Sequence, residues 1–314
     1  MTCPSRLALL VAGAVVAAVT MAVAPASAAA DVVQRAGPWV VVRSDPQWAA
    51  YADQGLTTVG STIVTRGRDS VPDALADDGW THIGDPGSWH GAVLDAYQNS
   101  TGMPAKLFTV TTAGGRSYRL VHPLAHGEAP NNSFAAVAPG GRYFVSGEWG
   151  TMRRLLVFRL PSLTRRTTTL GLDATIALTR PVRDVQGCAF DGATHLLCST
   201  NDPSPGLFPT GRQLLDVALA HPLDGGPDRG RPRYLGTVAM GFPCDTTSTG
   251  EVEGIDVSRH VLRVLVNSPC SSESMLVTMS DSRAVRADPD PHLRWDIAAA
   301  QYPLVAGRNE DSAG

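Results

Sequence analysis

One strand–turn–strand phrase recurs four times along the chain, and this repeat constrains the fold more than any other feature of the sequence. Each copy opens with a polar residue and continues with a short strand of apolar or small residues. In the last three copies a tight turn and a second apolar strand follow, and a further hairpin comes after every copy. The copies begin at His90, Ser133, Gln186 and Glu253. The sequence therefore predicts units of four strands that recur roughly every 40 to 70 residues.

A four-stranded antiparallel unit cannot bury both of its faces alone, whereas several units stacked radially around an axis can. We therefore predict an all-β fold, a β-propeller of four-stranded antiparallel blades, with a β-sandwich as the competing architecture. The 31 Gly and 23 Pro agree with it, because strand exits need turn residues. A fifth blade is expected from residues 38–45 and 61–67, with residues 293–304 closing the ring. Five blades are favoured, and six are the alternative.

The first 28 residues have the pattern of a secretory signal peptide. Arg6 precedes an apolar run from Leu7 to about Val23, and Ala26 and Ala28 supply small residues at the minus-three and minus-one positions of a cleavage site. An uncleaved membrane anchor is the alternative, because the run approaches a short spanning length. We expect cleavage after residue 28, a single mature domain over residues 29–314, and a secreted protein with no later membrane segment.

The charge of the chain argues against a nucleic-acid partner. The formal net charge is −3 and 18% of the residues are charged, so no basic surface is predicted. Lys106 is the one lysine among 26 basic residues, and therefore the only candidate for Schiff-base chemistry. The excess of Arg, with many Ala and Gly, indicates a GC-rich genome and an actinomycete source. We expect a monomer whose partner is an extracellular small molecule, glycan or protein.

The cysteines predict two disulfides. Cys3 leaves with the signal peptide, and the four remaining cysteines of an exported chain most often form two bridges. Cys188 and Cys198 flank the turn sequence DGAT and would face each other across a hairpin. Cys244 and Cys270 flank the next hairpin, so we pair them together. A metal site is the alternative, although the spacing contains no CxxC.

Three stretches carry a resemblance to known proteins. They are WTHIGDPGSWHGAVLDAYQ from Trp80, NNSFAAVAPGGRYFVSGEWGTMRRLLVF from Asn131 and VQGCAFDGATHLLCSTNDP from Val185. The chain resembles a group of exported actinomycete proteins with β-propeller-like repeats, from about Trp80 to about Cys270. The resemblance implies a propeller-like architecture and an extracellular location, and it implies no catalytic residues.

Polar residues at matching positions of the four units would meet at one mouth of the propeller axis, because each inner strand starts there. This ring comprises His90, Ser133 with Asn132 beside it, Gln186 and Glu253, and two residues earlier lie Ser88, Asn131, Asp184 and Glu251. Its oxygen atoms would suit Ca²⁺, which takes six to eight oxygen ligands. The candidate metal ligands are Glu253, Gln186, Asn132 and Asp184. Alternatively, these side chains hydrogen-bond water and neighbouring strand ends.

Calcium-dependent lactonase propellers of the senescence-marker and paraoxonase kind hold a Ca²⁺ on such a ring. The chain is distantly similar to them in placing Glu253 directly before a glycine, but it lacks a partner Asp-Gly or Asn-Gly set. The similarity implies a Ca²⁺ cofactor and hydrolysis of a lactone or related ester. Glu251 and Glu253 also form a carboxylate pair on one strand, although two side chains on the same side of a sugar do not flank a glycosidic bond.

Three further motifs are weighed against ordinary structural roles. His122, His126 and Glu128 lie close together, but the surrounding Pro and Gly favour a loop with solvated histidines over a zinc site. Glu148 and Trp149 end a strand, where the indole could stack on a sugar or peptide or pack between blades. The stretch around Asp288 is expected to be a rigid acidic turn rather than a calcium loop.

These observations predict an extracellular binding or scaffold protein that uses the axial face of the propeller. Its candidate ligand contacts are Trp149, Glu148, Asn132 and Gln186. The alternative is a Ca²⁺-dependent hydrolase of a lactone, phosphate or related ester at the same mouth. In that case Glu253 serves as metal ligand or base, Gln186 and Asn132 are ligands, and His90 transfers protons. The sequence contains no GxSxG, HExxH, P-loop or GxGxxG motif, which argues against serine hydrolases, zinc proteases and nucleotide enzymes.

Overall fold

The computed structural model describes residues 34–99, 102–130, 134–203, 205–238, 250–268 and 272–283, and the backbone of residues 305–306. The chain divides into Met1–Val32, which lie outside the described residues, and a second unit, Val33–Gly314. Everything below concerns this second unit. Among its described residues, no helix has the length and apolar character to cross a membrane.

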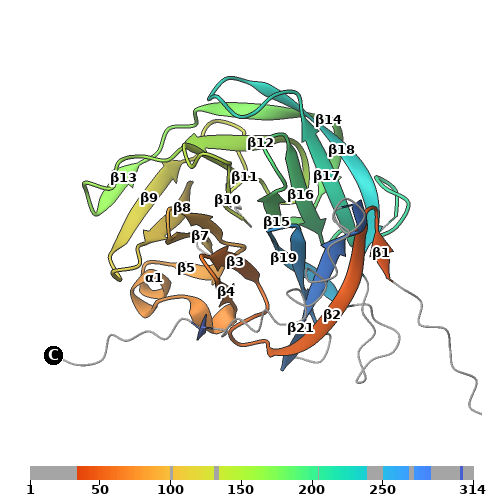
Figure 1. The fold of residues 1–314 in the computed structure, drawn as a ribbon. Helices are drawn as coiled ribbons and strands as arrows, with labels where there is room; N and C mark the ends of the chain where they lie inside the picture. The colour runs from red at the N-terminus through yellow and green to blue at the C-terminus, as the bar shows by residue number, and fades with distance from the viewer. Residues whose placement is uncertain are drawn as a thin grey trace, which may run out of the picture. The chain divides into compact units, whose positions relative to one another are not determined.

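The described strands form five blades (Figure 1). The first blade contains the antiparallel strands β3 (Gly55–Val59) and β4 (Thr62–Arg66), with β22 (Val305–Ala306) parallel to β4. The chain then passes through η1 (Arg68–Ser70) and α1 (Asp73–Asp77). The second blade contains β5 (Trp80–Ile83), β6 (Gly87–Trp89), β7 (Ala92–Asn99), β8 (Ala105–Thr111) and β9 (Ser117–Pro123).

The other three blades have four strands or more. The third contains β10 (Ala136–Val137), β11 (Tyr143–Ser146), β12 (Thr151–Arg159) and β14 (Ala174–Arg183). The fourth contains β15 (Val185–Phe190), β16 (His195–Thr200), β17 (Gln213–Leu219) and β18 (Asp228–Thr237). The fifth contains β19 (Glu251–Ser258), β20 (Val261–Asn267), β21 (Glu273–Asp281), β2 (Trp39–Trp48) and β1 (Arg35–Ala36).

The inner strands of the five blades close a ring. β3 contacts β6, β6 contacts β10, β10 contacts β15, β15 contacts β19, and β19 returns to β3. A parallel bridge between Asp85 and Phe134 shows that neighbouring inner strands of the second and third blades run in the same direction. This topology is that of a β-propeller. The predicted all-β propeller is confirmed, with five blades among the described residues rather than six.

The ring is closed by a strand from near the start of the chain. β2 pairs antiparallel with β21 from Trp39 opposite Asp281 to Trp48 opposite Glu273. The prediction that residues 38–45 belong to the fifth, N-terminal unit was therefore wrong, because these residues supply the outer strand of the last blade. Residues 61–67 do belong to the first blade, as β4. Residues 293–304 lie outside the described part of the chain.

Outer strands connect neighbouring blades in two places. β14 and β18 pair in parallel, which joins the third and fourth blades into one eight-stranded sheet. β13 (Thr167–Thr169) follows β12 in the sequence but pairs in parallel with β9 of the second blade. β13 therefore belongs to the second blade, and β14 is the strand that pairs with β12 in the third.

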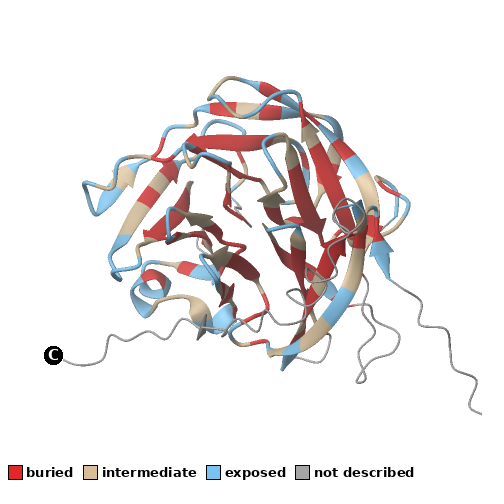
Figure 2. Ribbon diagram, viewed as in Figure 1, coloured by how far each residue is buried: buried red, intermediate tan, exposed pale blue. Residues whose placement is uncertain are grey.

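The core lies between the blades (Figure 2). Between the second and third blades, Phe108 packs against Phe144 and Phe158 with ring centroids 4.8 and 5.5 Å apart. Strands with neighbours on both faces lose the alternation of apolar and polar residues, as the fully buried Tyr143–Ser146 shows. Burial of such side chains contributes about 1.5–3 kcal/mol each.

The first predicted disulfide is confirmed. Cys188 on β15 lies directly opposite Cys198 on β16, and the two sulfur atoms are bonded. The bridge connects neighbouring strands of the fourth blade across the turn that DGAT forms. Cys244 and Cys270 lie outside the described residues.

Candidate functional site

The axial face is defined here as the end of the blades at which the inner strands begin. At or near the start of three inner strands, a polar residue is followed by glycine: Gln54–Gly55, Gln186–Gly187 and Glu253–Gly254. A Cβ atom on Gly187 or Gly254 would lie well inside van der Waals distance of the Asp85 carboxylate. Glycine is therefore required at these positions because the inner strands approach the axis too closely for a side chain.

The carboxylate of Asp85 occupies the axis and connects several blades. Oδ1 accepts the N–H of Leu56 in the first blade at 3.0 Å, and Oδ2 accepts the N–H of Ile255 in the fifth at 3.1 Å. Its own backbone carbonyl accepts the N–H of Ala135, next to the third blade. Burial raises the pKa of Asp85 well above its ordinary value, although the two N–H groups oppose the shift.

Gln186 and Glu253, which the repeat predicts to share a ring, occupy equivalent positions in the fourth and fifth blades. Each lies at a β-bulge: the register shifts by one residue between Val185 and Gly187 and again between Val252 and Ile255. A bulge redirects the side chain of the extra residue. Burial, followed by the charges of nearby carboxylates, raises the pKa of Glu253 well above its ordinary value. Gln186 is half-buried, and Glu251 is exposed.

His90 does not join this ring. It occupies the turn between β6 and β7, with a φ of 49°, and its exposed ring lies beside Trp89. That turn follows the inner strand, whereas Glu253 stands where an inner strand starts, so the two residues lie at opposite ends of their blades. The predicted copy of the repeat that begins at His90 therefore starts one strand too late. It begins at β7, whereas the inner strand of the second blade is the interrupted segment Trp80–Trp89.

The remaining predicted metal ligands are dispersed or undescribed. Asp184 precedes β15 with a φ of 50°, and its N–H donates to the Gly150 carbonyl at 3.1 Å. Burial and the charge of Asp202 raise the pKa of Asp184. Asn131, Asn132, Ser133 and Asp288 lie outside the described residues. Within the part of the chain that the structure describes, no group of three or more His, Cys, Asp or Glu side chains could hold a metal ion.

Glu148 and Trp149 lie on the axial face, in the turn between β11 and β12. Trp149 is 49% exposed. Glu148 accepts the N–H of Ala129 at 2.8 Å, and both of its oxygen atoms accept hydrogen bonds from Arg154, at 2.9 and 3.0 Å. Burial alone would raise the pKa of Glu148, but these hydrogen bonds hold it below its ordinary value. The turn therefore presents an exposed indole beside an anchored ion pair.

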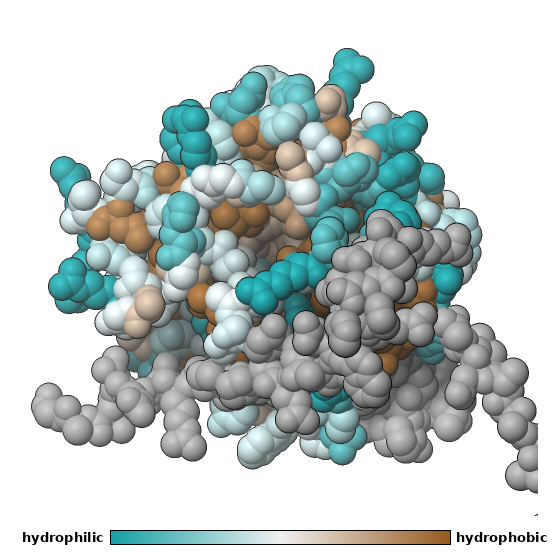
Figure 3. All heavy atoms as spheres, viewed as in Figure 1, coloured by the Kyte–Doolittle hydropathy of each residue, from teal (hydrophilic) through white to brown (hydrophobic). Residues whose placement is uncertain are grey.

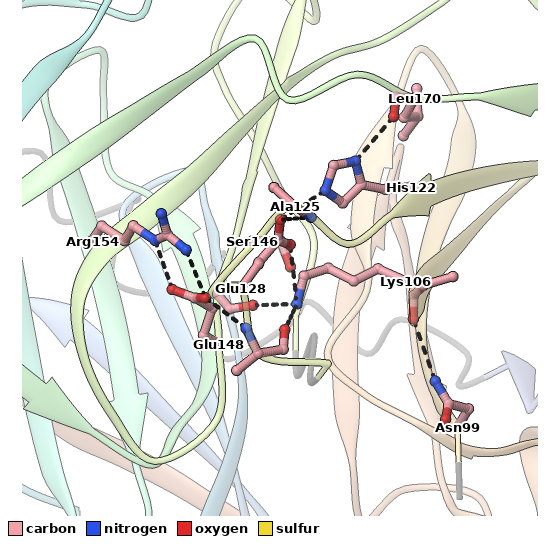
Figure 4. Close-up of polar contacts among 12 residues, drawn as sticks. Asn99, Lys106, His122, Ala125, Glu128, Ser146, Glu148, Arg154 and Leu170 are labelled. Carbon is pink, nitrogen blue, oxygen red and sulfur yellow. Dashed lines mark hydrogen bonds and ion pairs between the residues drawn. The ribbon is translucent and has the colours of Figure 1, made fainter. Parts of the chain in front are cut away.

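A buried cluster lies between the second and third blades (Figure 4). We call Lys106, His122 and Glu128 the interblade cluster. The Lys106 ammonium donates to the Ala129 carbonyl at 2.6 Å and lies 3.6 Å from Glu128 Oε1. His122 Nε2 lies 2.9 Å from Glu128 Oε2, and its Nδ1 donates to the Leu170 carbonyl at 3.0 Å, since a carbonyl only accepts. Burial lowers the pKa of Lys106 to about 8.

The sequence interpretation missed this cluster. It placed both histidines in a solvated loop, whereas His122 is buried on β9 and only His126 is exposed in the loop after it. The one available signal was the single lysine of the chain, which was noted only as a possible Schiff base. Asp85 was also missed, and the recurrent glycines after Gln186 and Glu253 were the signal for it.

The described Trp, Tyr and Phe residues that are exposed share one face. Trp48 and Tyr51 pack edge to face with ring centroids 5.5 Å apart. Trp48 ends β2 opposite Glu273, and Glu251 at the start of the inner strand pairs with Asn267 at the same end of the blade. These residues and Trp149 therefore all belong to the axial face. In Figure 3, apolar side chains lie scattered between polar ones on the part of this face that the described residues form.

Comparison with known proteins gives structural likeness only. No protein-family model and no curated protein match the chain. The β-propeller domain of Cps50 (Swd1) from Myceliophteria thermophila is 12% identical, with a TM-score of 0.29 over 68% of this chain and 57% of that domain. A putative glycoside hydrolase from Parabacteroides distasonis is 11% identical, with a TM-score of 0.38 over 63% of this chain and 67% of that one. The WD40 repeats of RRP9 are 14% identical, with a TM-score of 0.30 over 78% of this chain and 56% of that one. These scores carry no argument about function, and the fold assignment rests on the strand topology.

Proposed function

We propose that this chain is an exported binding protein whose axial face takes an extracellular saccharide. The observation that supports the proposal best is the location of the exposed aromatic residues. Trp48, Tyr51 and Trp149 are the exposed Trp, Tyr and Phe side chains among the described residues, and all three belong to the axial face. Exposed indole and phenol rings leave apolar surface in water, and covering that surface with a ligand is favourable.

Saccharides fit this chemistry because a sugar ring has one apolar C–H face and a rim of hydroxyl groups. An indole covers the apolar face, while anchored polar groups beside it bind the hydroxyls. Beside Trp149 those groups are the Arg154 guanidinium, paired with Glu148, and the half-buried Asp184 of the adjoining blade, whose N–H donates to the Gly150 carbonyl. An exposed indole beside anchored polar groups is typical of a binding surface.

Export is part of the same proposal. The signal-like N-terminal pattern and the Cys188–Cys198 bridge support it, because disulfides persist in oxidising compartments and are rare in the cytosol. The calcium-dependent hydrolase stays a prediction that no observation of the structure favours. Burial and the charges of nearby carboxylates raise the pKa of Glu253, which disfavours the charged form that a Ca²⁺ ligand requires. Melting with and without a chelator tests that alternative directly.

The proposal is tested by calorimetric titration of the protein with soluble cello-, chito-, xylo- and manno-oligosaccharides. We expect at least one series to bind, and Trp149→Ala to weaken it by about tenfold or more, as for aromatic hot spots. Val42→Ala is the matched control, because Val42 is also 49% exposed but lies within β2, away from its axial end. Binding that is equal in Trp149→Ala and wild type, or no binding by any series, would overturn the proposal.

A further inference from the structure

Lys106 is unusual both in the sequence and in the structure. It is the one lysine among 26 basic residues, and its side chain is fully buried. Fully buried lysines are rare, because removing an ammonium from water is unfavourable unless it is paired and hydrogen-bonded. A buried ion pair seldom improves stability over apolar packing, so its presence calls for another explanation, such as fixing one specific arrangement.

The ammonium connects two loops that come from different blades. It donates to the Ala129 carbonyl at 2.6 Å, in the segment between β9 and β10, and to the Gly147 carbonyl at 3.3 Å, in the turn between β11 and β12. The N–H of Ala129 donates to Glu148 Oε1. The peptide groups around Ala129 are therefore held from both sides, by Lys106 and by Glu148, and Figure 4 shows these side chains converging.

The turn that carries Trp149 depends on such contacts for its conformation. Trp149 and Glu148 stand between Gly147 and Gly150, and Gly150 has a φ of 75°. Glycine accepts many backbone conformations, so a turn with glycine at both ends depends on contacts to other segments. The Glu148 side chain makes such contacts with Ala129 and Arg154. On one side the turn is fixed by Lys106 through the Gly147 carbonyl. On the other side it is fixed by the N–H of Asp184 through the Gly150 carbonyl.

We propose that Lys106 is the positioning residue of the ligand-binding turn: its buried ammonium holds Gly147 and Ala129 together and thereby fixes Trp149 in its binding orientation. The role of Trp149 in binding rests on the proposed function, whereas the role of Lys106 in fixing the orientation of Trp149 does not. A compact ammonium with three donors suits two carbonyls and a carboxylate that converge on one point, whereas the planar guanidinium of Arg needs more space. The chain, otherwise rich in Arg, uses Lys here.

The arrangement also makes the turn sensitive to pH. The groups that face the ammonium are Glu128 from the loop, with His122 behind it on β9, and the Glu148–Arg154 pair from the third blade. With its pKa lowered to about 8, Lys106 becomes neutral in mildly alkaline solution and loses its attraction to Glu128 and Glu148. Ligand affinity should therefore weaken between pH 7 and 9. The pKa values of Glu128 and Glu148 are lowered, so these carboxylates do not titrate in this range.

The test compares the wild type with Lys106→Met and with the double variant Lys106→Met/Glu128→Gln, which removes both buried charges and so remains foldable if the single variant is not. The indole N–H resonance of Trp149 is assigned with Trp149→Phe and followed from pH 6 to 10, together with the affinity for a bound oligosaccharide. We expect a wild-type transition near pH 8 that both variants lack, a displaced resonance in the variants, and about tenfold weaker binding.

A folded double variant with the wild-type Trp149 resonance at every pH, or with unchanged affinity, would overturn the positioning role. A merely structural Lys106 would lower the melting temperature while leaving both readouts unchanged. If the wild type binds none of the oligosaccharides, the proposed function fails, but the resonance still decides whether Lys106 positions Trp149. The two failures are therefore distinguishable.

Discussion

The axis of the propeller and the interblade cluster both bury charged groups, but they neutralise them differently. At the axis, the carboxylate of Asp85 is held by backbone N–H groups of Leu56 and Ile255, which come from two other blades. In the interblade cluster, Glu128 is held by the side chains of Lys106 and His122. At the axis, the contacts join the backbones of inner strands that must meet for the ring to close. In the interblade cluster, they join the loops that position Trp149 on the axial face.

The two regions should also respond oppositely to pH. The pKa values of Asp85 and Glu253 are raised, so the folded state retains protons that the unfolded chain has lost, and stability falls as pH rises through the folded pKa values. The pKa values of Glu128 and Glu148 are lowered. Their contribution is present above the unfolded value of 4.5 and is lost as pH falls through the folded values.

The largest expected effect comes from filling the axis. Gly254→Val would place a branched side chain against the Gly55 backbone and the Asp85 carboxylate, where not even a Cβ fits. We expect a loss of more than about 4 kcal/mol in unfolding free energy, or failure to fold, because the Gly55 Cα is backbone and the Asp85 carboxylate is held by two backbone N–H groups. Gly171→Ala is the control, since nothing lies within 4 Å of its added Cβ. Equal urea midpoints for the two variants would show that the inner strands can separate.

Next in size is the replacement of Asp85 by Asn. An amide has one acceptor oxygen, so either the N–H of Leu56 or that of Ile255 loses its partner and faces a donor. A buried donor without a partner costs about 1–3 kcal/mol. Urea denaturation of Asp85→Asn measures this cost, and Asp85→Ala, which frees both N–H groups, should cost more. If Asp85→Asn matches the wild type, the carboxylate does not hold the blades together.

The same contrast explains what could be read from the sequence. The fourth and fifth blades begin with similar phrases, Gln186–Gly187 and Glu253–Gly254, and their hairpins are local, so their inner strands and the Cys188–Cys198 bridge followed from short-range patterns. The second blade was displaced by one strand, because Gly84–Pro86 interrupts its inner strand and the longer apolar run of β7 looked like the start.

Contacts between distant segments left no comparable pattern. Nothing local in β2 indicates that its partner is β21, more than two hundred residues later, so the closure of the ring was assigned to the wrong blade. Lys106, Glu128 and Glu148 come from a strand, a loop and a turn in two blades, and their spacing matches no motif. The composition alone showed that the single lysine was exceptional, without showing its partners.

A third prediction concerns the axial response to pH. Glu253→Gln removes a carboxyl group whose pKa is raised, so the variant should lose the part of the alkaline destabilisation that Glu253 causes. Relative to the wild type, it should gain stability as pH rises from about 4.5, with a slope of at most about 1.4 kcal/mol per pH unit for one proton. Melting curves of the variant and the wild type from pH 4 to 9 measure the difference in their stability. Lys106 is present in both proteins, so its titration cancels in this difference. A difference that does not change with pH would mean that Glu253 titrates normally.

The smallest expected effect comes from Arg154, which pairs with Glu148 at the solvent-exposed side of the interblade cluster. Arg154 is 36% exposed in its side chain, so its ion pair with Glu148 is screened by solvent and should contribute only about 0.2–1 kcal/mol. Arg154→Met should therefore barely change the urea midpoint, in contrast to the axial variants. It should nevertheless raise the pKa of Glu148, because hydrogen bonds from Arg154 are the main influence that lowers it. Carboxyl NMR titration of Glu148 detects this shift and its decrease with added salt. If Glu148 titrates in Arg154→Met as in the wild type, its lowered pKa is due to the N–H of Ala129 and to Lys106 instead. The charge of Glu148 would then be set by its buried partners and not by the exposed arginine.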